Sequence, residues 1–298
     1  MDVIIDTDPG IDDALALFLA LNSPELDIRA IVAVHGNVSV QQAGRNILNI
    51  LEIALPGHIP SVIEGAARPL RRLRLKKDYR IHGKDGLGNA DLPQPRLKPA
   101  KTELRDILKK SKNISMICLG PLTNLAGLIL SDSDLPGRLK EIILMGGAVK
   151  VAGNVSQFAE FNIYSDPEAA KIVLHCGIPI TMVGLDVTRQ VMLTKKDLEP
   201  LDVSVPRLCF IKKIAYHYIE FHSKYRNMNG CFMHDPLAIA VAIDRSIVRT
   251  EKLSVEVITG GDKAGQTFIK KNGRPNADVC LKVNAGKFME LFSSRVLK

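Results

Sequence analysis

Four aspartates crowd the segment IIDTDPGIDD at 4–13. Asp6 and Asp8 follow an apolar run, with Asp8 placed to cap the next turn, and Asp12 and Asp13 fall where a helix is expected to begin. Capping accounts for one or two carboxylates, and several held close together raise one another's pKa unless a cation shares them. Carboxylates and backbone carbonyls without clustered Cys or His suit a hard cation such as Ca²⁺ or Mg²⁺. Such a cation acidifies a bound water, whose proton a neighbouring carboxylate can take.

Two other kinds of motif do not fit this segment. Phosphotransferases with a phosphorylated first Asp continue their DxD with a small residue and then Thr or Val, whereas Pro9 and Gly10 follow Asp8 here. The chain also has no GxGxxG after its first strand, and no GxxxxGK followed by Ser or Thr. The aspartates therefore favour a cation site.

Apolar runs rich in Val and Ile recur along the first 185 residues, with helix-like segments between them. Such runs are typical of strands buried on both faces, in a parallel sheet covered by helices. One amphipathic helix is expected at 40–54, and another over 165–177 with Asp166 as its cap, Pro167 at its first position and Gly177 as its stop. The predicted strands are 2–7, 28–36, 59–63, 114–120, 141–147 and 178–184.

The pattern becomes more helical after residue 185, with helices expected at 205–225 and 235–244, a strand-rich tail and a last helix from about Ala285. No linker or internal repeat divides the chain, so one domain over residues 1–298 is the simplest organisation. We predict an α/β fold: a single domain with a mostly parallel, Rossmann-like open sheet flanked by helices and a more helical C-terminal half. Residues 64–100 form a long excursion, of the kind that is usually functional.

The bulk composition excludes several classes of protein. No apolar run reaches the roughly 18 residues of a membrane span, and no signal peptide opens the chain, so we expect a cytoplasmic protein without a membrane partner. Five scattered cysteines without a CxxC predict reduced thiols rather than disulfides or a zinc site. The net charge of +8 is densest in RPLRRLRLKKDYR at 68–80, which has one aromatic residue and no nucleic-acid module. We interpret it as a solvated loop, and no nucleic-acid partner is expected.

Polar clusters follow five of the predicted strands, at the carboxyl ends where the site of an open α/β sheet lies. One of them, GPLTN, also has a purely structural interpretation, with Pro121 and Asn124 opening a helix. The clusters are DTDPG at 6–10, HGN at 35–37, LGPLTN at 119–124, MGG at 145–147 and GLDVT at 184–188.

Together with GNVSQFAEFNIYSDPEAA at 153–170 and HDPLA at 234–238, these motifs make the chain resemble the inosine-uridine type nucleoside hydrolases over nearly its whole length. The resemblance implies hydrolysis of the N-glycosidic bond of ribonucleosides to ribose and free base, in a homodimer or homotetramer. Carboxylates around the sugar suit the positive charge that develops on it as the bond breaks. Histidine can assist base departure near neutral pH.

The resemblance also implies a role for individual residues. One Ca²⁺ per subunit would be held by Asp8, Asp13, Asp235 and the carbonyl of Leu119, with Asp8 as the general base on the attacking water. His234 would help the base to leave, and His82 would line the base pocket from the excursion. The implied ribose ligands are Asp12, Asn37, Asn154, Glu160 and Asn162, with Asp6 in support.

The spacing of Asn154, Glu160 and Asn162 excludes a single helical face, so these side chains are expected to converge from an irregular loop. An extended 160–162 would point Glu160 and Asn162 to the same side.

The preferred base is less well defined by the sequence than the reaction. The chain has no Trp to stack on a purine, and its His82 and His234 resemble the pyrimidine-preferring or nonspecific branch of the family. Tyr218, His222 and Tyr225 are candidates for the base pocket, although aromatic residues on a helix more often belong to the core. The alternative is a non-catalytic member that binds ribosides or metal without turnover.

Overall fold

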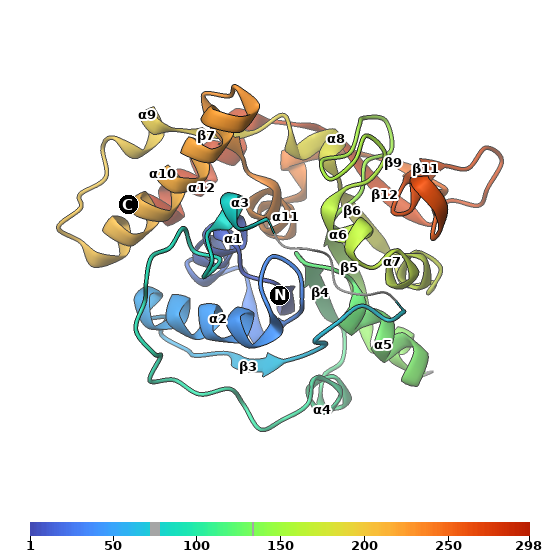
Figure 1. The fold of residues 1–298 in the computed structure, drawn as a ribbon. Helices are drawn as coiled ribbons and strands as arrows, with labels where there is room; N and C mark the ends of the chain where they lie inside the picture. The colour runs from blue at the N-terminus through green and yellow to red at the C-terminus, as the bar shows by residue number, and fades with distance from the viewer. Residues whose placement is uncertain (72–77, 133) are drawn as a thin grey trace.

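An eight-stranded, mostly parallel sheet forms the centre of the molecule (Figure 1). The computed structural model describes residues 1–71, 78–132 and 134–298. Within these residues the strand pair β12/β9 is antiparallel and the other pairs of the large sheet are parallel, which confirms the predicted sheet. The strand order is β3 (Ser61–Glu64), β2 (Asp27–Ala33), β1 (Asp2–Thr7), β4 (Ile114–Cys118), β5 (Leu139–Met145), β6 (Ile180–Val183), β12 (Ala277–Val283) and β9 (Val248–Leu253).

Two small antiparallel sheets and several short helices complete the framework. The small sheets pair β7 (Met192–Thr194) with β8 (Gly230–Phe232), and β10 (Val255–Val257) with β11 (Thr267–Ile269). The short helices are α3 (Tyr79–His82), α6 (Phe161–Ser165), α8 (Leu185–Thr188), α9 (Lys195–Leu198) and the 3₁₀ turns Leu135–Gly137, Arg245–Ile247 and Gly261–Lys263.

Longer helices cover both faces of the sheet and bury two apolar clusters. Val3 and Ile5 of β1 belong to one cluster and Ile4 to the other, as expected for side chains that alternate across a strand. Burial on both faces explains why the strands read as continuous apolar runs. The first cluster includes α1 (Ile11–Leu21), α2 (Val40–Ala54), α10 (Pro206–Arg226), α11 (His234–Ile243) and α12 (Ala285–Val296); the second includes α4 (Leu104–Lys110), α5 (Thr123–Ser131) and α7 (Pro167–Leu174).

The strand order reverses at β1, which pairs with β2 on one side and β4 on the other. Asp6 lies opposite Cys118 in the β1/β4 register, and the Leu119 amide donates to the Asp6 carbonyl at 2.7 Å. The chain therefore leaves β1 and β4 side by side, at the kind of switch point where doubly wound sheets bind their ligands. This register brings the aspartate segment next to the Leu119 carbonyl.

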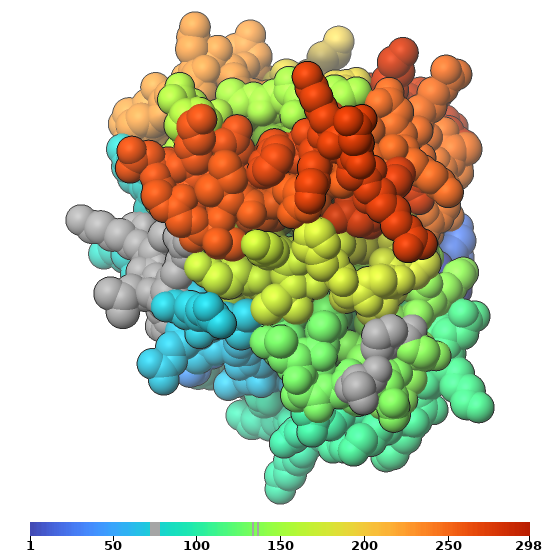
Figure 2. All heavy atoms as spheres, turned by 90° about the vertical axis from the view of Figure 1, so that its right-hand side faces the viewer, coloured from blue at the N-terminus to red at the C-terminus, as the bar shows by residue number. Residues whose placement is uncertain are grey.

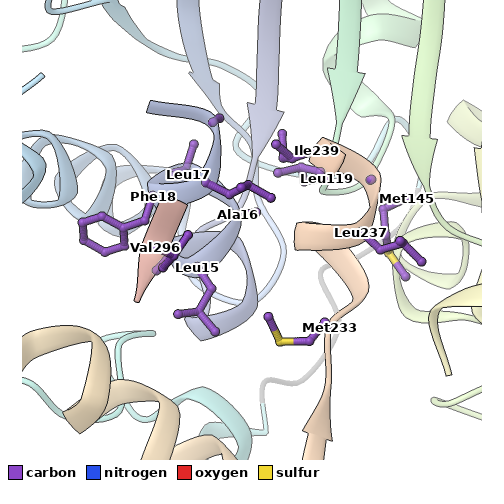
Figure 3. Packing of buried hydrophobic residues seen from close by; sticks show 14 of the residues in the cluster. Leu15, Ala16, Leu17, Phe18, Leu119, Met145, Met233, Leu237, Ile239 and Val296 are labelled. Atoms are coloured by element: carbon purple, nitrogen blue, oxygen red, sulfur yellow. The ribbon is translucent and has the colours of Figure 1, made fainter. Parts of the chain in front are cut away.

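Helices α1 and α11 pack against each other beneath the site. Figure 3 shows Phe18 of α1 beside Val296 of α12, and Leu237 and Ile239 of α11 on the side of Leu119 and Met145. Phe18 also meets the Phe210 ring edge-on at 6.1 Å. The packing fixes where the first turns of α1 and α11, which carry the aspartates, lie relative to each other.

The C-terminal strand β10 packs beside α7, and on the face shown in Figure 2 the orange and red segments lie above the yellow-green segment. Asn276 donates to the Leu174 carbonyl at 3.1 Å, and Glu256 contacts His175 at 3.1 Å. The tail of the chain thereby closes the edge of the sheet next to β6 through β12 and its own antiparallel neighbour β9.

Most predicted element boundaries agree with the structure to within a few residues, and two predictions need comment. Gly177 is not the stop of α7, because the helix ends at Leu174 and the His175 amide turns back to the carbonyls of Ile172 and Val173. Residues 72–77 of the basic stretch 68–80 lie outside the described residues, so the solvated loop predicted for this stretch stays a prediction.

All five cysteines are free, as predicted, and three of them are buried. Among the described residues, no helix is long and apolar enough to cross a membrane.

Phe292 tests how far the fold depends on the C-terminal helix, since its side chain is fully buried in the first cluster. Phe292→Ala is expected to lower the free energy of unfolding by about 3–5 kcal/mol, because it removes a large apolar contact and leaves a cavity. Urea denaturation measures the loss. Phe268→Ala is the matched control: that ring is 37% exposed, so its loss should stay within about 0.5 kcal/mol. Equal losses for the two variants would contradict the burial of α12.

Candidate active site

The turn from β1 into α1 is closed by Asp13. Its Oδ2 accepts from the Gly10 amide at 2.9 Å, and its Oδ1 accepts from the Thr7 hydroxyl at 2.5 Å and the Asp8 amide at 3.2 Å. Gly10 is the N-cap of α1, so the prediction that Asp8 caps this turn is wrong. The Asp8 carboxylate instead turns to the neighbouring strand end and accepts from the Asn37 amide at 2.5 Å.

The Asp8 carboxylate packs directly against two glycines, Gly36 and Gly120, which follow β2 and β4. A Cβ on Gly36 would lie 1.9 Å from Asp8 Oδ2, and one on Gly120 would lie 2.5 Å from Oδ1. Asp8 Oδ1 is buried and has no hydrogen-bond partner among the described residues. A buried carboxylate oxygen of this kind needs a cation, a proton or a bound ligand.

Asp12 joins the first turns of α1 and α11. Its Oδ2 accepts from the amides of His234 at 3.2 Å and Asp235 at 3.3 Å, so it caps α11 from another helix. Its Oδ1 is buried without a hydrogen-bond partner in the described part of the chain. Burial raises the pKa of Asp12 well above its usual value, and the charge of Asp13 raises it further.

Six buried carboxylates lie in this region, and the charges of several raise the pKa of others. Burial raises the pKa of Asp235 well above its usual value, and the charges of Asp13, Asp12, Asp8 and Glu160 each add to the rise. Asp8 behaves in the same way under the charges of Asp13 and Asp6. Like charges confined this closely are far easier to accommodate when a cation lies among them.

The donor set fits a hard cation, because each candidate donor atom is an oxygen. Asp8 lies in the loop before α1, Asp13 in the first turn of α1 and Asp235 in the first turn of α11. The Leu119 carbonyl directly follows β4. That carbonyl accepts from Asn162 Nδ2 at 2.6 Å. Among the described residues, no three His, Cys, Asp or Glu side chains already form a closed metal cluster. Two features therefore favour a cation at this site: the unpaired Asp8 oxygen and the mutual repulsion of the carboxylates.

Glu160 and Asn162 are buried side by side, but not in an extended segment as predicted. The helix α6 begins at Phe161, because the Glu160 carboxylate caps it by accepting from the amides of Asn162 and Ile163. Glu160 also accepts from the Gly147 amide at 3.0 Å. The Asn162 side-chain amide donates one hydrogen to the Leu119 carbonyl and the other to the Met145 carbonyl. The side-chain oxygen of Asn162 is the group that can accept from a ligand hydroxyl.

The two remaining ribose candidates lie at the more exposed side of the cluster. Asn37 donates to Asp13 Oδ2 at 3.3 Å, so it is next to the aspartates. Asn154 accepts from the Phe161 amide at 2.9 Å, which ties its irregular loop to the start of α6. Its NH₂ group is then free to donate to a ligand.

His82 reaches the site from the excursion. Its Nδ1 accepts from the Ile11 amide at 3.1 Å, and its ring packs on the Tyr218 ring at 5.2 Å. Burial, together with the nearby His222, lowers the pKa of His82 to about 3, so the ring is neutral. Because its Nδ1 accepts a hydrogen bond, the ring carries its proton on Nε2.

His234 opens α11, and its Nδ1 lies 2.6 Å from the hydroxyl of Thr188. Burial lowers its pKa to about 3, with further contributions from His222 and Arg189. Tyr218 is 5% exposed; burial raises the pKa of its phenol, and the charge of Asp12 raises it further. Of the three aromatic pocket candidates, Tyr218 and His222 are buried, whereas Tyr225 is 47% exposed and stacks on Phe221 at 5.1 Å.

The sequence analysis missed several residues that hold this site in place. Arg189 donates to the carbonyls of Ala152 and Gly153 at 2.8 and 2.7 Å, which fixes the loop before Asn154. Asn124, which the sequence suggested only as a helix opener, bonds the Asp6 carboxylate and the Ala33 carbonyl, and α5 begins at Thr123 rather than Pro121. The available signal was that Asn124 lies within the polar cluster at 119–124 and that Arg189 directly follows the one at 184–188.

Buried carboxylates with unpaired oxygens, at the switch point of a doubly wound sheet, are typical of the active site of an α/β enzyme. More narrowly, the chain belongs to the inosine-uridine preferring nucleoside hydrolase family, whose model matches residues 3–290. It is an N-ribohydrolase, an enzyme that cleaves the N-glycosidic bond of ribonucleosides.

Known proteins resemble the chain over almost its full length. "Probable uridine nucleosidase 2" of Arabidopsis thaliana is 37% identical over 314 residues, covering 99% of this chain and 97% of the relative. The pyrimidine-specific ribonucleoside hydrolase RihA of Salmonella paratyphi B is 35% identical and covers 99% and 98%. The solved structure of a purine-preferring ribonucleoside hydrolase from Gardnerella vaginalis superposes with a TM-score of 0.93 at 32% identity, covering 99% and 98%.

Gly36→Ala tests the placement of Asp8. The added methyl would lie 1.9 Å from Asp8 Oδ2 and must displace the carboxylate, so kcat/KM is expected to fall by about 10²-fold, the cost of a misplacement of roughly 1 Å. Steady-state nucleoside hydrolysis measures the loss. Gly57→Ala, where the added Cβ meets nothing within 4 Å, is the control. Full activity of Gly36→Ala would show that Asp8 does not need its present position.

Proposed function

We propose that the aspartate cluster hydrolyses ribonucleosides with Asp8 as the general base on the attacking water. The observation that carries the proposal is the Asp8 carboxylate itself. One oxygen is fixed by the Asn37 amide, and the other is buried without a partner among the described residues. A carboxylate held in this way can take a proton from a water without first giving up a hydrogen bond of its own.

The remaining residues divide between the ribose and the base. Asp12 Oδ1 and the Asn162 oxygen accept from the 2′- and 3′-hydroxyls, with Asn37 close by, and Asn154 and Glu160 bind the 5′-hydroxyl. The carboxylates stabilise the positive charge that develops on the sugar as its bond to the base breaks. The electron pair of that bond goes to the base, the hydroxyl of water goes to C1′, and the remaining hydrogen ends on the base.

The two histidines act on the base side. His234 donates a hydrogen bond to the departing base, whose negative charge it stabilises, and His82 lines the pocket from above Tyr218. Both rings are neutral near pH 7, since burial holds the pKa of each at about 3. They therefore serve as hydrogen-bond donors rather than as cations.

The cation in this proposal is one Ca²⁺ per subunit, held by Asp8, Asp13, Asp235 and the Leu119 carbonyl. When bound, it would lower the pKa of the attacking water and bind ribose hydroxyls. The all-oxygen donor set supports calcium, a hard cation that accepts six to eight oxygen ligands.

We further propose that the chain is a single domain, assembles as a homodimer or homotetramer, and is pyrimidine-preferring or nonspecific. The names of the uridine- and pyrimidine-specific relatives and the histidines at 82 and 234 support this base preference. The structurally similar Gardnerella vaginalis enzyme is named as purine-preferring, so a test of base preference should include purine nucleosides.

Asp8→Ala is expected to lower base release by at least about 10²-fold, because it removes the general base. The assay is chromatographic detection of free base from uridine, cytidine, inosine and adenosine, with calcium present. The wild type beside it ranks the four bases. A folded wild type that releases no base from any nucleoside would favour the alternative, a member that binds ribosides without turnover.

Removal of calcium should destabilise the protein more at higher pH. Burial raises the pKa of Asp8 and of Asp235 well above their usual values, so the cation-free fold retains protons that the unfolded chain releases above pH ~4. That stability is present below pH ~4 and is lost as the pH rises through the raised pKa values. Calcium replaces those protons, so the gain in Tm that it gives should grow from pH 5 to pH 8.

Thermal unfolding with calcium and with a chelator, at each pH, measures this gain. Asp235→Asn should reduce the gain at pH 8, because it removes a ligand. A gain in Tm that does not depend on pH would contradict a site built from protonated carboxyls.

A further inference from the structure

The imidazole of His234 forms a hydrogen bond with a side chain that lies 46 residues away in the sequence. Thr188 is the last residue of α8, directly after β6, and its side chain is fully buried. Its hydroxyl lies 2.6 Å from His234 Nδ1, a short distance for a hydrogen bond between a hydroxyl and a ring nitrogen. Nothing in the GLDVT motif beyond its place at a strand end indicated this contact.

The direction of this hydrogen bond decides what the other ring nitrogen can do. In the described part of the chain the Thr188 hydroxyl has no second hydrogen-bond partner, so its single hydrogen is available to His234 Nδ1. A neutral imidazole that accepts at Nδ1 carries its own hydrogen on Nε2 and is a donor there.

The same arrangement occurs at the second histidine with a donor that cannot reverse. His82 Nδ1 accepts from a backbone amide, that of Ile11, at 3.1 Å. Both site histidines are thus bonded through Nδ1. His82 has its hydrogen on Nε2, and His234 has the same tautomer when the Thr188 hydroxyl is the donor. For His82 the backbone sets this tautomer, and for His234 a threonine hydroxyl takes the place of the backbone.

We propose that Thr188 is a positioning residue that holds His234 in the Nε2–H tautomer and so makes it a hydrogen-bond donor to the departing base. The inference rests on the role of His234 in the proposed function. Without the hydroxyl, Nδ1 loses its donor, the ring is free to carry its hydrogen on either nitrogen, and its orientation is no longer fixed.

The test compares two leaving groups. A nucleoside base needs a hydrogen-bond donor to depart, whereas the 4-nitrophenolate of 4-nitrophenyl riboside is a weak base that departs without one. Thr188→Val removes the hydroxyl at nearly constant volume. It should lower kcat about tenfold to a hundredfold with the nucleoside that the wild type cleaves fastest, a part of the ~10²–10⁴ that acid-base assistance provides. With the nitrophenyl riboside, kcat should stay within about threefold of the wild type.

Three companion variants make the result specific. Thr188→Ser keeps the hydroxyl and should restore most of the nucleoside activity. Thr181→Val removes a hydroxyl from β6 that bonds Arg245 rather than His234, and should leave both substrates unaffected. His234→Ala should show the same substrate dependence as Thr188→Val, with a larger loss on the nucleoside.

Equal losses on both substrates for Thr188→Val would overturn the inference, since a structural defect does not distinguish leaving groups. Full nucleoside activity of Thr188→Val together with loss in His234→Ala would also overturn it, while leaving the role of His234 intact. Full nucleoside activity of His234→Ala would instead refute the proposed role of that histidine and, with it, the inference.

The tautomer can also be measured directly in the wild type, without relying on the folding of a variant. Long-range ¹H–¹⁵N NMR spectra of the ring, assigned with His234→Ala, should show the hydrogen on Nε2. A hydrogen on Nδ1 in the wild type would overturn the inference.

Discussion

The rest of this structure depends on the burial of several carboxylates in one place. Asp8, Asp12, Asp13 and Asp235 are each at most 5% exposed; burial raises the pKa of all four, and the charge of Asp13 raises the pKa of the other three further. Backbone amides are the groups that stabilise them: those of Asp8 and Gly10 for Asp13, Asn37 for Asp8, and His234 and Asp235 for Asp12. Amides stabilise charge without adding it, so the cluster keeps its need for a cation.

The doubly wound topology brings several chain segments to one edge of the sheet, where their backbone amides can bind the buried carboxylates. The β1/β4 register sets Asp8 next to Leu119, and the packing of α1 on α11 sets Asp12 against the first amides of α11. Glycine at 36 and 120 leaves room for Asp8, which a Cβ at either position would displace. The helix N-termini add a favourable field for negative charge.

The order of strands and helices, the aspartate cluster and its oxygen-only chemistry could be predicted from the sequence, because apolar periodicity and local spacing determine them. One error arose where a distant amide replaced a local cap, and the other where a local cap started a helix in place of an extended segment. Asp8 is placed to cap its own turn, but the Asn37 amide binds it instead, and Glu160 begins a helix at 161 where an extended segment was expected. The contact of Thr188 with His234 spans 46 residues, so no local pattern reports it.

The ribose and base sides of the site have different structural supports. The carboxylates belong to the sheet and its packed helices, whereas His82 comes from the excursion and Tyr218 and His222 from α10. Under the proposed function, a change of base preference would involve the excursion and α10 rather than the β1/β4 edge. A purine-preferring enzyme shares the fold at a TM-score of 0.93, and a probable uridine nucleosidase is 37% identical in sequence. Among the described residues the two sides are joined by the Ile11 amide with His82 and by the His234 amide with Asp12, so the backbone at the start of α1 and α11 couples the proposed base residues to the carboxylates.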